Sequence, residues 1–391
     1  MTIETKSSAP PPPRPDSRRE DTAPRRSGAA LLGYRAWWVV RFLVALFFFV
    51  GALQLMRTGA ASLDVLEPGG FLVRNPFTTL GLGWLGALFV LSGSPIAATA
   101  LTLVKAGEEA AATGAAHFTE IQGFTMLTGS RLGAAFVVLV VAVIYALRGG
   151  EGERVKPVST AVLALSTTAV IYIPSALLGY GLLRWRPFAS LELTFPHQFA
   201  DIIDLVYGGI IDTVETWPSA LVFLGGLGVL LLSFKLIDAV MPSLDEKSIG
   251  EHRLEWLRGK WQMFGLGSFV ALITMSVSVA LTVLVPLVSK KYVKREDIIP
   301  YIMGANITTL GDTMFAAFAL HSPGAVRIVL AEVIATSVFS VILLAFFYPQ
   351  LRKGIWKFQK AMVRSKPRLA IFTAALFLVP LTLIYLGGSL G

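Results

Sequence analysis

The chain has 391 residues, of which 54% are hydrophobic and only 15% are charged, and its mean hydropathy is +0.67. Soluble domains carry about 25% charged residues, so this composition excludes a water-soluble protein and predicts an integral membrane protein. The sequence contains no cysteine, which excludes disulfides, thiolate metal sites and thiol nucleophiles. The useful unit of length is therefore the roughly 20 apolar residues that cross about 30 Å of hydrocarbon.

Residues 1–33 are rich in proline and arginine and hold few apolar side chains, which predicts a disordered cytoplasmic tail. The first apolar run, 36–56, is followed by no small-residue cleavage site and so resembles a signal anchor. Six more full-length spans bring the expected total to about seven, at 120–147, 158–183, 219–240, 298–320, 326–348 and 369–388.

Two further apolar stretches, 78–104 and 262–288, are interrupted midway by small polar residues. The interruptions are Ser92-Gly93-Ser94-Pro95 and Ser276-Val277-Ser278. A continuous helix facing lipid gains nothing from such a break. Each stretch is therefore predicted to form a re-entrant hairpin, in which two half-helices meet at membrane depth inside the protein.

The distribution of basic residues supports this layout. With both stretches as hairpins, the predicted internal loops carry 25 Lys and Arg and the external loops carry 6, as the positive-inside rule requires. This predicts a multi-pass protein of the cell membrane with a cytoplasmic N-terminus and an external C-terminus. The segment 349–391 is expected to combine a basic amphipathic stretch on the inner membrane surface with the final span. Topology and anionic lipid explain the net charge of +9, so no nucleic acid is invoked.

The two interrupted stretches share a register. Gly83 aligns with Gly267 and Leu91 with Met275, and further on Gly129 aligns with Gly304. Because the first block begins inside and the second outside, we expect two inverted repeats, 34–183 and 219–348, joined by an external interfacial segment, 184–218. The predicted fold is an all-α polytopic membrane protein. Inverted repeats with paired broken segments are typical of secondary transporters whose substrate site lies at the midplane.

These motifs also resemble those of a known family, the type II sodium/phosphate cotransporters, over roughly 45–348. The matching segments are Asn75-Pro76-Phe77, Ser92 and Ser94, Leu103-Val104-Lys105-Ala106-Gly107, and Gly304-Ala305-Asn306-Ile307-Thr308-Thr309. The resemblance implies that these segments supply ligands for sodium and phosphate. The chain departs from the pattern at Leu91 and Met275, which replace a glutamine in both repeats, and at Arg131, which replaces an asparagine. It resembles a divergent member.

An anion at the midplane needs donors such as the N–H groups at half-helix N-termini. Ser94-Pro95 fits such an end, with serine as N-cap and proline next. The candidate substrate-binding residues are Ser92, Ser94, Arg131, Ser276, Ser278 and Asn306. The alternative is that the serines only satisfy the backbone of the hairpins or let helices approach closely.

Arg131 lies within a predicted span, where a guanidinium costs at least roughly 2.5 kcal/mol and must face a cavity, a partner or a ligand. Its forked geometry suits phosphate. Asp312 follows the matching motif of the opposite repeat and is its expected partner. Either Arg131 binds an anion while Asp312 tunes it, binds a cation or accepts a coupling proton, or the two form a structural pair.

The candidate ion-binding residues are hydroxyl and carboxyl side chains, namely Thr128, Ser130, Thr308, Thr309 and Asp312. The alternative for the hydroxyls is hydrogen bonding between helices. Sodium is the coupling ion that the resemblance implies, with protons through Asp312 as the alternative. We expect no other cofactor.

The leading functional prediction is a secondary active transporter of phosphate or a phosphate-like anion. The alternatives are a transporter, proton-coupled or uncoupled, of a larger phosphorylated or lipid-linked phosphate compound, and a membrane assembly protein that no longer transports. A membrane enzyme is not expected, because no cluster of His, Asp or Glu appears at a predicted membrane surface. The expected partners are the phosphate-bearing substrate, membrane lipids and a second copy of the chain in a homodimer.

Overall fold

The structure, a computed structural model, describes residues 28–60, 70–115, 117–148, 155–185, 197–240, 259–282, 284–289 and 297–389. Within these ranges every regular element is a helix. The helices are α1 (Gly28–Ala60), α2 (Pro76–Val90), α3 (Ser94–Ala112), α4 (Glu120–Ala134), α5 (Phe136–Arg148), α6 (Val155–Trp185), α7 (His197–Val214), α8 (Ser219–Val240), α9 (Lys260–Thr274), α10 (Val277–Thr282), α11 (Leu284–Ser289), α12 (Ile298–Thr308), α13 (Leu310–Ala319), α14 (Pro323–Ile342), the π-helix η5 (Leu343–Phe347), α15 (Tyr348–Val363) and α16 (Lys366–Ser389).

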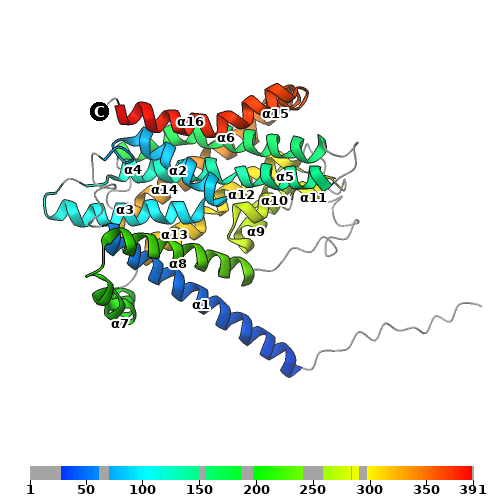
Figure 1. The fold of residues 1–391 in the computed structure, drawn as a ribbon. Coiled ribbons are helices and arrows are strands. Elements are labelled where there is room, and N and C mark those ends of the chain that lie inside the picture. The colour runs from blue at the N-terminus through cyan, green and yellow to red at the C-terminus, as the bar shows by residue number, and fades with distance from the viewer. Residues whose placement is uncertain are drawn as a thin grey trace, which may run out of the picture.

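Six helical segments of the described chain are long and apolar enough to cross a membrane. They are Val39–Ala60, Glu120–Leu147, Val155–Trp185, Ser219–Leu236, Pro323–Val363 and Lys366–Ser389. Most of the helices run side by side along one direction, and α7 lies across one end of the bundle beside α1 and α8 (Figure 1). The protein is an α-helical membrane protein.

Three boundaries differ from the sequence prediction, and the described chain has six candidate spans where about seven were expected. The span predicted at 120–147 is divided at Ala135 into α4 and α5. The segment 298–320, predicted as one continuous span, is divided at Thr309 into α12 and α13. Thr308 and Thr309 donate their hydroxyls to carbonyls one turn back, which bends helices, and Gly311 follows with low helix propensity. At the other end of the chain, α1 begins at Gly28, within the predicted tail; residues 1–27 lie outside the described chain.

Helix breaks coincide with both predicted interruptions. Leu91 (φ 58°) follows α2 and Met275 (φ 45°) follows α9, both in the left-handed region. For a residue with a side chain this conformation costs roughly 1–2 kcal/mol, so each break is imposed by the surrounding packing. Beyond the breaks, α3 and α10 begin. The turn after α2 is closed by the Ser92 amide, which donates to the Ala87 carbonyl at 3.2 Å.

Glycines bring α2 and α4 into backbone contact. A Cβ atom added at Gly83 would collide with the carbonyl oxygen of Met126, and one at Gly129 would collide with that of Leu80. Each glycine therefore meets the carbonyl three residues before its partner glycine. This reciprocal pattern lets two helices approach without side chains between them.

The same contact recurs between α9 and α12. A Cβ atom at Gly267 would meet the carbonyl oxygen of Tyr301, and one at Gly304 would meet that of Phe264. Again each carbonyl lies three residues before the partner glycine. The register that aligned Gly83 with Gly267 and Gly129 with Gly304 in sequence thus corresponds to one interhelical geometry that occurs twice.

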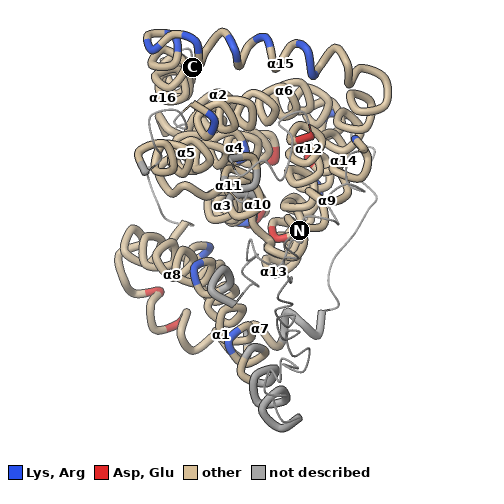
Figure 2. The backbone as a smooth tube through the Cα atoms, turned by 90° about the vertical axis from the view of Figure 1, so that its right-hand side faces the viewer, with Lys and Arg blue, Asp and Glu red and all other residues tan. Residues whose placement is uncertain are grey.

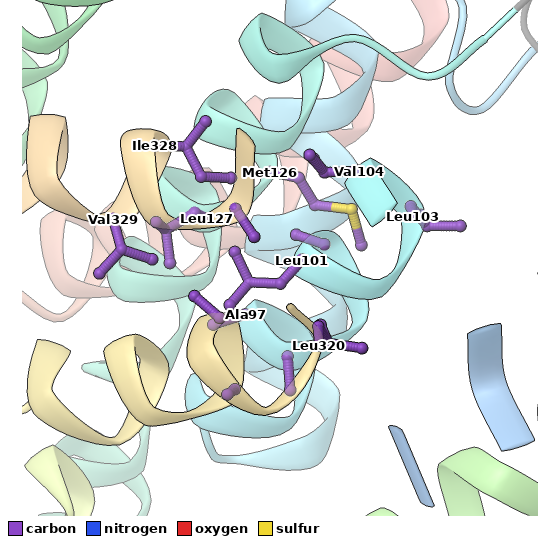
Figure 3. Close-up of a cluster of buried hydrophobic side chains, with 14 of the residues drawn as sticks. Ala97, Leu101, Leu103, Val104, Met126, Leu127, Leu320, Ile328 and Val329 are labelled. Atoms are coloured by element: carbon purple, nitrogen blue, oxygen red, sulfur yellow. The ribbon is translucent and has the colours of Figure 1, made fainter. Parts of the chain in front are cut away.

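Beside the first of these helix pairs, apolar side chains of several helices, among them α3, α4, α13 and α14, pack into a continuous core (Figure 3). Leu101 of α3 and Leu127 of α4 meet Ile328 and Val329 of α14 there, and Leu320 at the end of α13 closes the cluster. This packing holds α3, α4, α13 and α14 together and so fixes the relative positions of the polar groups they carry.

The last helix packs against the outside of α2. The Asn75 amide, at the N-cap of α2, donates to the Gly387 carbonyl of α16 at 2.6 Å, and Arg74 donates to the Gly388 carbonyl at 2.9 Å. Before α16, α15 carries basic residues along one outer edge of the bundle (Figure 2). This arrangement agrees with the amphipathic pattern predicted for that segment.

Candidate functional site

Four helices bring polar and charged side chains to one buried region. α3 presents Ser94 at its first residue, immediately after the first break, and α13 presents Asp312 in its first turn. α4 contributes Arg131 and α14 contributes Glu332, and all four residues are buried. Figure 2 shows acidic positions in the interior of the bundle. Since α3 and α4 come from the first half of the chain and α13 and α14 from the second, both halves build the site.

The predicted partnership of Arg131 and Asp312 is present. Arg131 Nη2 lies 3.9 Å from Asp312 Oδ1, and the two side chains are only 2% and 4% exposed. Thr313 bridges them, because its hydroxyl accepts from Arg131 Nη2 and donates to Asp312 Oδ1 at 2.8 Å. Ser94 also interacts with the Asp312 carboxylate. The break in the first half therefore lies beside the acidic residue of the second.

This contact corrects the role expected for Ser94. The sequence predicted Ser94 as the N-cap of a half-helix, but the N-cap of α3 is Gly93, with Ser94 and Pro95 as the first two helical residues. At the first helical position a serine hydroxyl is free to turn away from the helix end. Here it interacts with Asp312, and α3 has no side-chain cap.

Glu332 is the main residue that the sequence reasoning missed. It is completely buried, and Thr128 of α4 donates to its Oε2 atom at 3.0 Å. Its carboxylate and that of Asp312 both interact electrostatically with Arg131. The signal was available, since Glu332 is an acidic residue in the apolar run 326–348, where a carboxylate, like the guanidinium of Arg131, must face a partner or a cavity.

A second polar network adjoins this cluster. The Tyr172 hydroxyl of α6 donates to the backbone carbonyl of Asn306 at 2.7 Å, and the Asn306 amide donates to the Thr168 hydroxyl at 3.3 Å. Tyr172 also lies within electrostatic range of Arg131, Asp312 and Glu332. Asn306, a predicted substrate-binding residue, is therefore connected to the charged cluster through Tyr172.

Three atoms of the cluster have no hydrogen-bond partner within the described part of the chain. They are Arg131 Nε, Asp312 Oδ2 and Glu332 Oε1, all buried. Buried charged groups are normally paired, since an unsatisfied one costs about 1–3 kcal/mol or more. The free atoms carry both signs of charge, so the cluster offers contacts to an anion and to a cation at the same time.

The remaining predicted residues lie elsewhere or bond locally. Ser130 donates to the Leu127 carbonyl, Thr308 to the Ser268 carbonyl at 2.9 Å, and Thr309 to the Ala305 carbonyl. The Ser276 hydroxyl accepts from the Val279 amide at 3.3 Å and so caps α10. Ser92 contributes the backbone bond described above, and the side chain of Ser278 lies outside the described structure.

No family model, curated protein or solved structure matches the chain.

Proposed function

We propose that the protein is a secondary active transporter that moves phosphate or a phosphate-like anion together with a cation through the buried cluster. The observation that carries this proposal is the charged cluster itself, in which Arg131, Asp312 and Glu332 each keep one polar atom without a partner among the described residues. A purely structural ion pair in a membrane protein gains nothing from such open atoms.

The balance of charge favours cotransport over simple anion passage. One guanidinium faces two carboxylates, so the formal charge of the three groups is −1 when all are ionised. An anion that enters such a site adds to the repulsion unless a cation accompanies it or a carboxylate takes up a proton. Arg131 Nε is placed to donate to the anion, and the free oxygens of Asp312 and Glu332 are placed to hold the cation.

The family resemblance implies sodium as the coupling cation, and this is the first version of the proposal. Protonation of Asp312 or Glu332 is the alternative, and it is favoured by the pairing of two buried carboxylates on one guanidinium. Both forms need the same two side chains, and they differ in which gradient, of sodium or of protons, drives uptake.

The arrangement of the halves supports a transporter built from inverted repeats. Two broken helices, each with a left-handed residue at the break, and two glycine contacts of identical register occur in the same order in both halves. In transporters of this kind, the breaks converge on the substrate site near the midplane. We therefore propose that the stretches 78–104 and 262–288 are re-entrant hairpins.

The test is uptake of radiolabelled phosphate by the purified protein in liposomes, under a sodium gradient or under a pH gradient. We expect uptake driven by one gradient, and we expect Arg131→Lys and Asp312→Asn to reduce it. Absence of uptake under both gradients, or unchanged uptake in both variants, would overturn the proposal.

A second candidate cargo is a larger phosphorylated or lipid-linked compound. The observation that favours it is the apolar character of Leu91 and Met275, which stand at the breaks where the resemblance implies glutamine. Such a compound would compete with phosphate in the uptake assay, whereas competition by inorganic anions alone would argue for a small substrate.

A further inference from the structure

Two hydroxyl groups continue the polar face of α14 beyond Glu332. Thr336 and Ser340 follow Glu332 by four and eight residues, so the three side chains lie on one face of the helix. All three are fully buried. Glu332 Oε1, Thr336 Oγ1 and Ser340 Oγ each have no hydrogen-bond partner among the residues the structure describes. At 1.5 Å per residue, this row extends for about 12 Å.

Other buried hydroxyls of the bundle behave differently. Thr99 donates to the Pro95 carbonyl at 2.9 Å, Thr102 to the Ala98 carbonyl at 2.9 Å, and Thr167 to the Leu163 carbonyl at 2.8 Å. Bonding to the preceding turn is the usual way for such a group to be satisfied inside a membrane. Thr336 and Ser340 do not use it. Two successive unsatisfied hydroxyls beside a free carboxylate oxygen mark a place for ordered water.

The row leads to an irregular and polar end of α14. The helix passes into the π-helix η5, where Lys260 Nζ donates to the Leu344 carbonyl at 2.8 Å. Nearby, α15 is tied to α6 by the Gln359 amide, which donates to the Ser159 hydroxyl at 2.6 Å. α6 also packs along α14. Polar groups therefore continue from the buried row toward the face of the molecule that carries the basic helix α15.

We propose that the face of α14 marked by Glu332, Thr336 and Ser340 lines a narrow hydrated path, which leads from the charged cluster to the α15 side of the membrane and admits water and small monovalent cations. The role of this path in coupling rests on the proposed transport function, whereas its existence does not. It supplies the access that a cation needs to reach the free oxygen of Glu332.

The charges around the inner end of the path favour cations. Among the described residues, the groups that interact with Glu332 are Thr128 and Arg131 from α4 and Tyr172 from α6, and both Arg131 and Tyr172 also interact with Asp312 from α13. The other charged contacts between α14 and the described helices lie at the first turns of α14. There Glu108 of α3 accepts from Ser322 and from the Gly324 amide, and Glu120 of α4 pairs with Arg327. The Tyr301 hydroxyl of α12 donates to the Ala280 carbonyl. Two carboxylates against one guanidinium leave a net attraction for positive charge.

The natural absence of cysteine allows a direct test, because each introduced thiol is unique. Thr336→Cys and Ser340→Cys change little in volume. Membrane vesicles of either orientation would be treated with silver ion or with a cationic or anionic methanethiosulfonate, then unfolded, and the remaining thiol labelled with a fluorescent maleimide. Val338→Cys is the matched control, since Val338 lies on the same helix between the two positions. Its side chain is 42% exposed on the outer surface of the bundle, away from the proposed path, so its thiol should stay unreactive. Lys353→Cys, on the exposed face of α15, is the positive control.

We expect Thr336→Cys and Ser340→Cys to react from the α15 side only, with silver ion and with the cationic reagent roughly tenfold faster than with the anionic one. Adding Glu332→Gln to Thr336→Cys should remove that preference for positive charge. The path would be overturned if the thiols at 336 and 340 stayed as unreactive as Val338→Cys while Lys353→Cys reacted. It would also be overturned if they reacted equally from both sides of the membrane. Failure of phosphate uptake would overturn the proposed function and leave this result unchanged.

Discussion

The contact between Arg131 and Asp312 is looser than a direct charge-assisted hydrogen bond. Their closest atoms are 3.9 Å apart, against roughly 2.7–2.9 Å for a direct bond, and Thr313 fills the interval. The guanidinium thus donates to Thr313, lies close to Asp312 and interacts electrostatically with Glu332. A side chain held in this way is fixed in position but keeps bonding capacity for a ligand.

Removal of one partner from this buried pair should destabilise the protein. We expect Arg131→Met to lower the free energy of unfolding by about 3–5 kcal/mol, because Asp312 then lacks a counter-charge. Arg131→Met combined with Asp312→Asn should recover a substantial part of that loss. Thermal unfolding of the purified protein in detergent measures both.

The control for this cycle is the partly exposed pair of Arg327 and Glu120, which is 27% and 33% exposed. Exposed pairs contribute little, so Arg327→Met should cost less than about 1 kcal/mol. Equal losses at the two pairs, or no recovery in the double variant, would contradict the role given to Asp312.

Glu332 should be required for coupling. Glu332→Gln keeps an acceptor for the Thr128 hydroxyl and a similar shape, so we expect a normal melting temperature. Without the carboxylate, cation-driven phosphate uptake should fall by about 5- to 150-fold, which is the change that a typical coupling free energy between two ligands produces. Glu109→Gln, which removes one side of the Arg57–Glu109 surface pair, should retain uptake. Full uptake by Glu332→Gln would exclude Glu332 from the cation site.

At the scale of the helices, the backbone contacts at glycine determine how the pairs α2–α4 and α9–α12 pack. Each glycine faces a carbonyl oxygen, so even a methyl group has no space. The internal alignment of the sequence already matched Gly83 with Gly267 and Gly129 with Gly304. It could not show which atoms each glycine contacts, because the contacting carbonyls lie on another helix.

We predict that Gly83→Ala and Gly267→Ala each lower the free energy of unfolding by about 1–3 kcal/mol through overpacking. Gly225→Ala is the control, since nothing lies within 4 Å of an added Cβ atom there. This change should be neutral or stabilising by up to about 1 kcal/mol, as expected for alanine in a helix. Melting temperatures in detergent compare the three. Similar values for Gly83→Ala and Gly225→Ala would show that α2 and α4 can separate without cost.

At the scale of the whole molecule, orientation in the membrane follows from the uneven distribution of basic residues. The predicted internal loops carry 25 Lys and Arg and the external loops carry 6. Several of those loops lie outside the described residues, but α15 and the turn that holds His117 are described and are exposed. They provide one marker for each predicted side.

We expect a thiol at His117→Cys to react with a membrane-impermeant maleimide in intact cells, and a thiol at Lys353→Cys to react only after the membrane is opened. Labelling can be assigned without background because the chain has no cysteine. The reverse pattern would invert the topology and with it the side from which the proposed path opens.

Membrane insertion and the two helix breaks could be predicted from the sequence, because each depends on local composition. Long apolar runs partition into hydrocarbon wherever they occur in a chain, and small polar residues and proline inside such a run disfavour a continuous helix. The division of 298–320 into α12 and α13 was missed although Thr308, Thr309, Gly311 and Asp312 surround the break, because the same polar residues are equally expected of ion ligands on a continuous span.

Which side chains form the buried charged cluster depends on the tertiary structure. Arg131 and Asp312 could be paired in advance, because the repeat places them at related positions. Glu332 and Thr128, which are 204 residues apart, have no such relation. Likewise, the first-turn position of Ser94 and the unpartnered hydroxyls of Thr336 and Ser340 depend on how α3, α13 and α14 pack. The sequence alone established that the chain enters a membrane and where two of its helices break, since hydrophobic partitioning is local, whereas the packing of helices distant in sequence decided which buried charges meet.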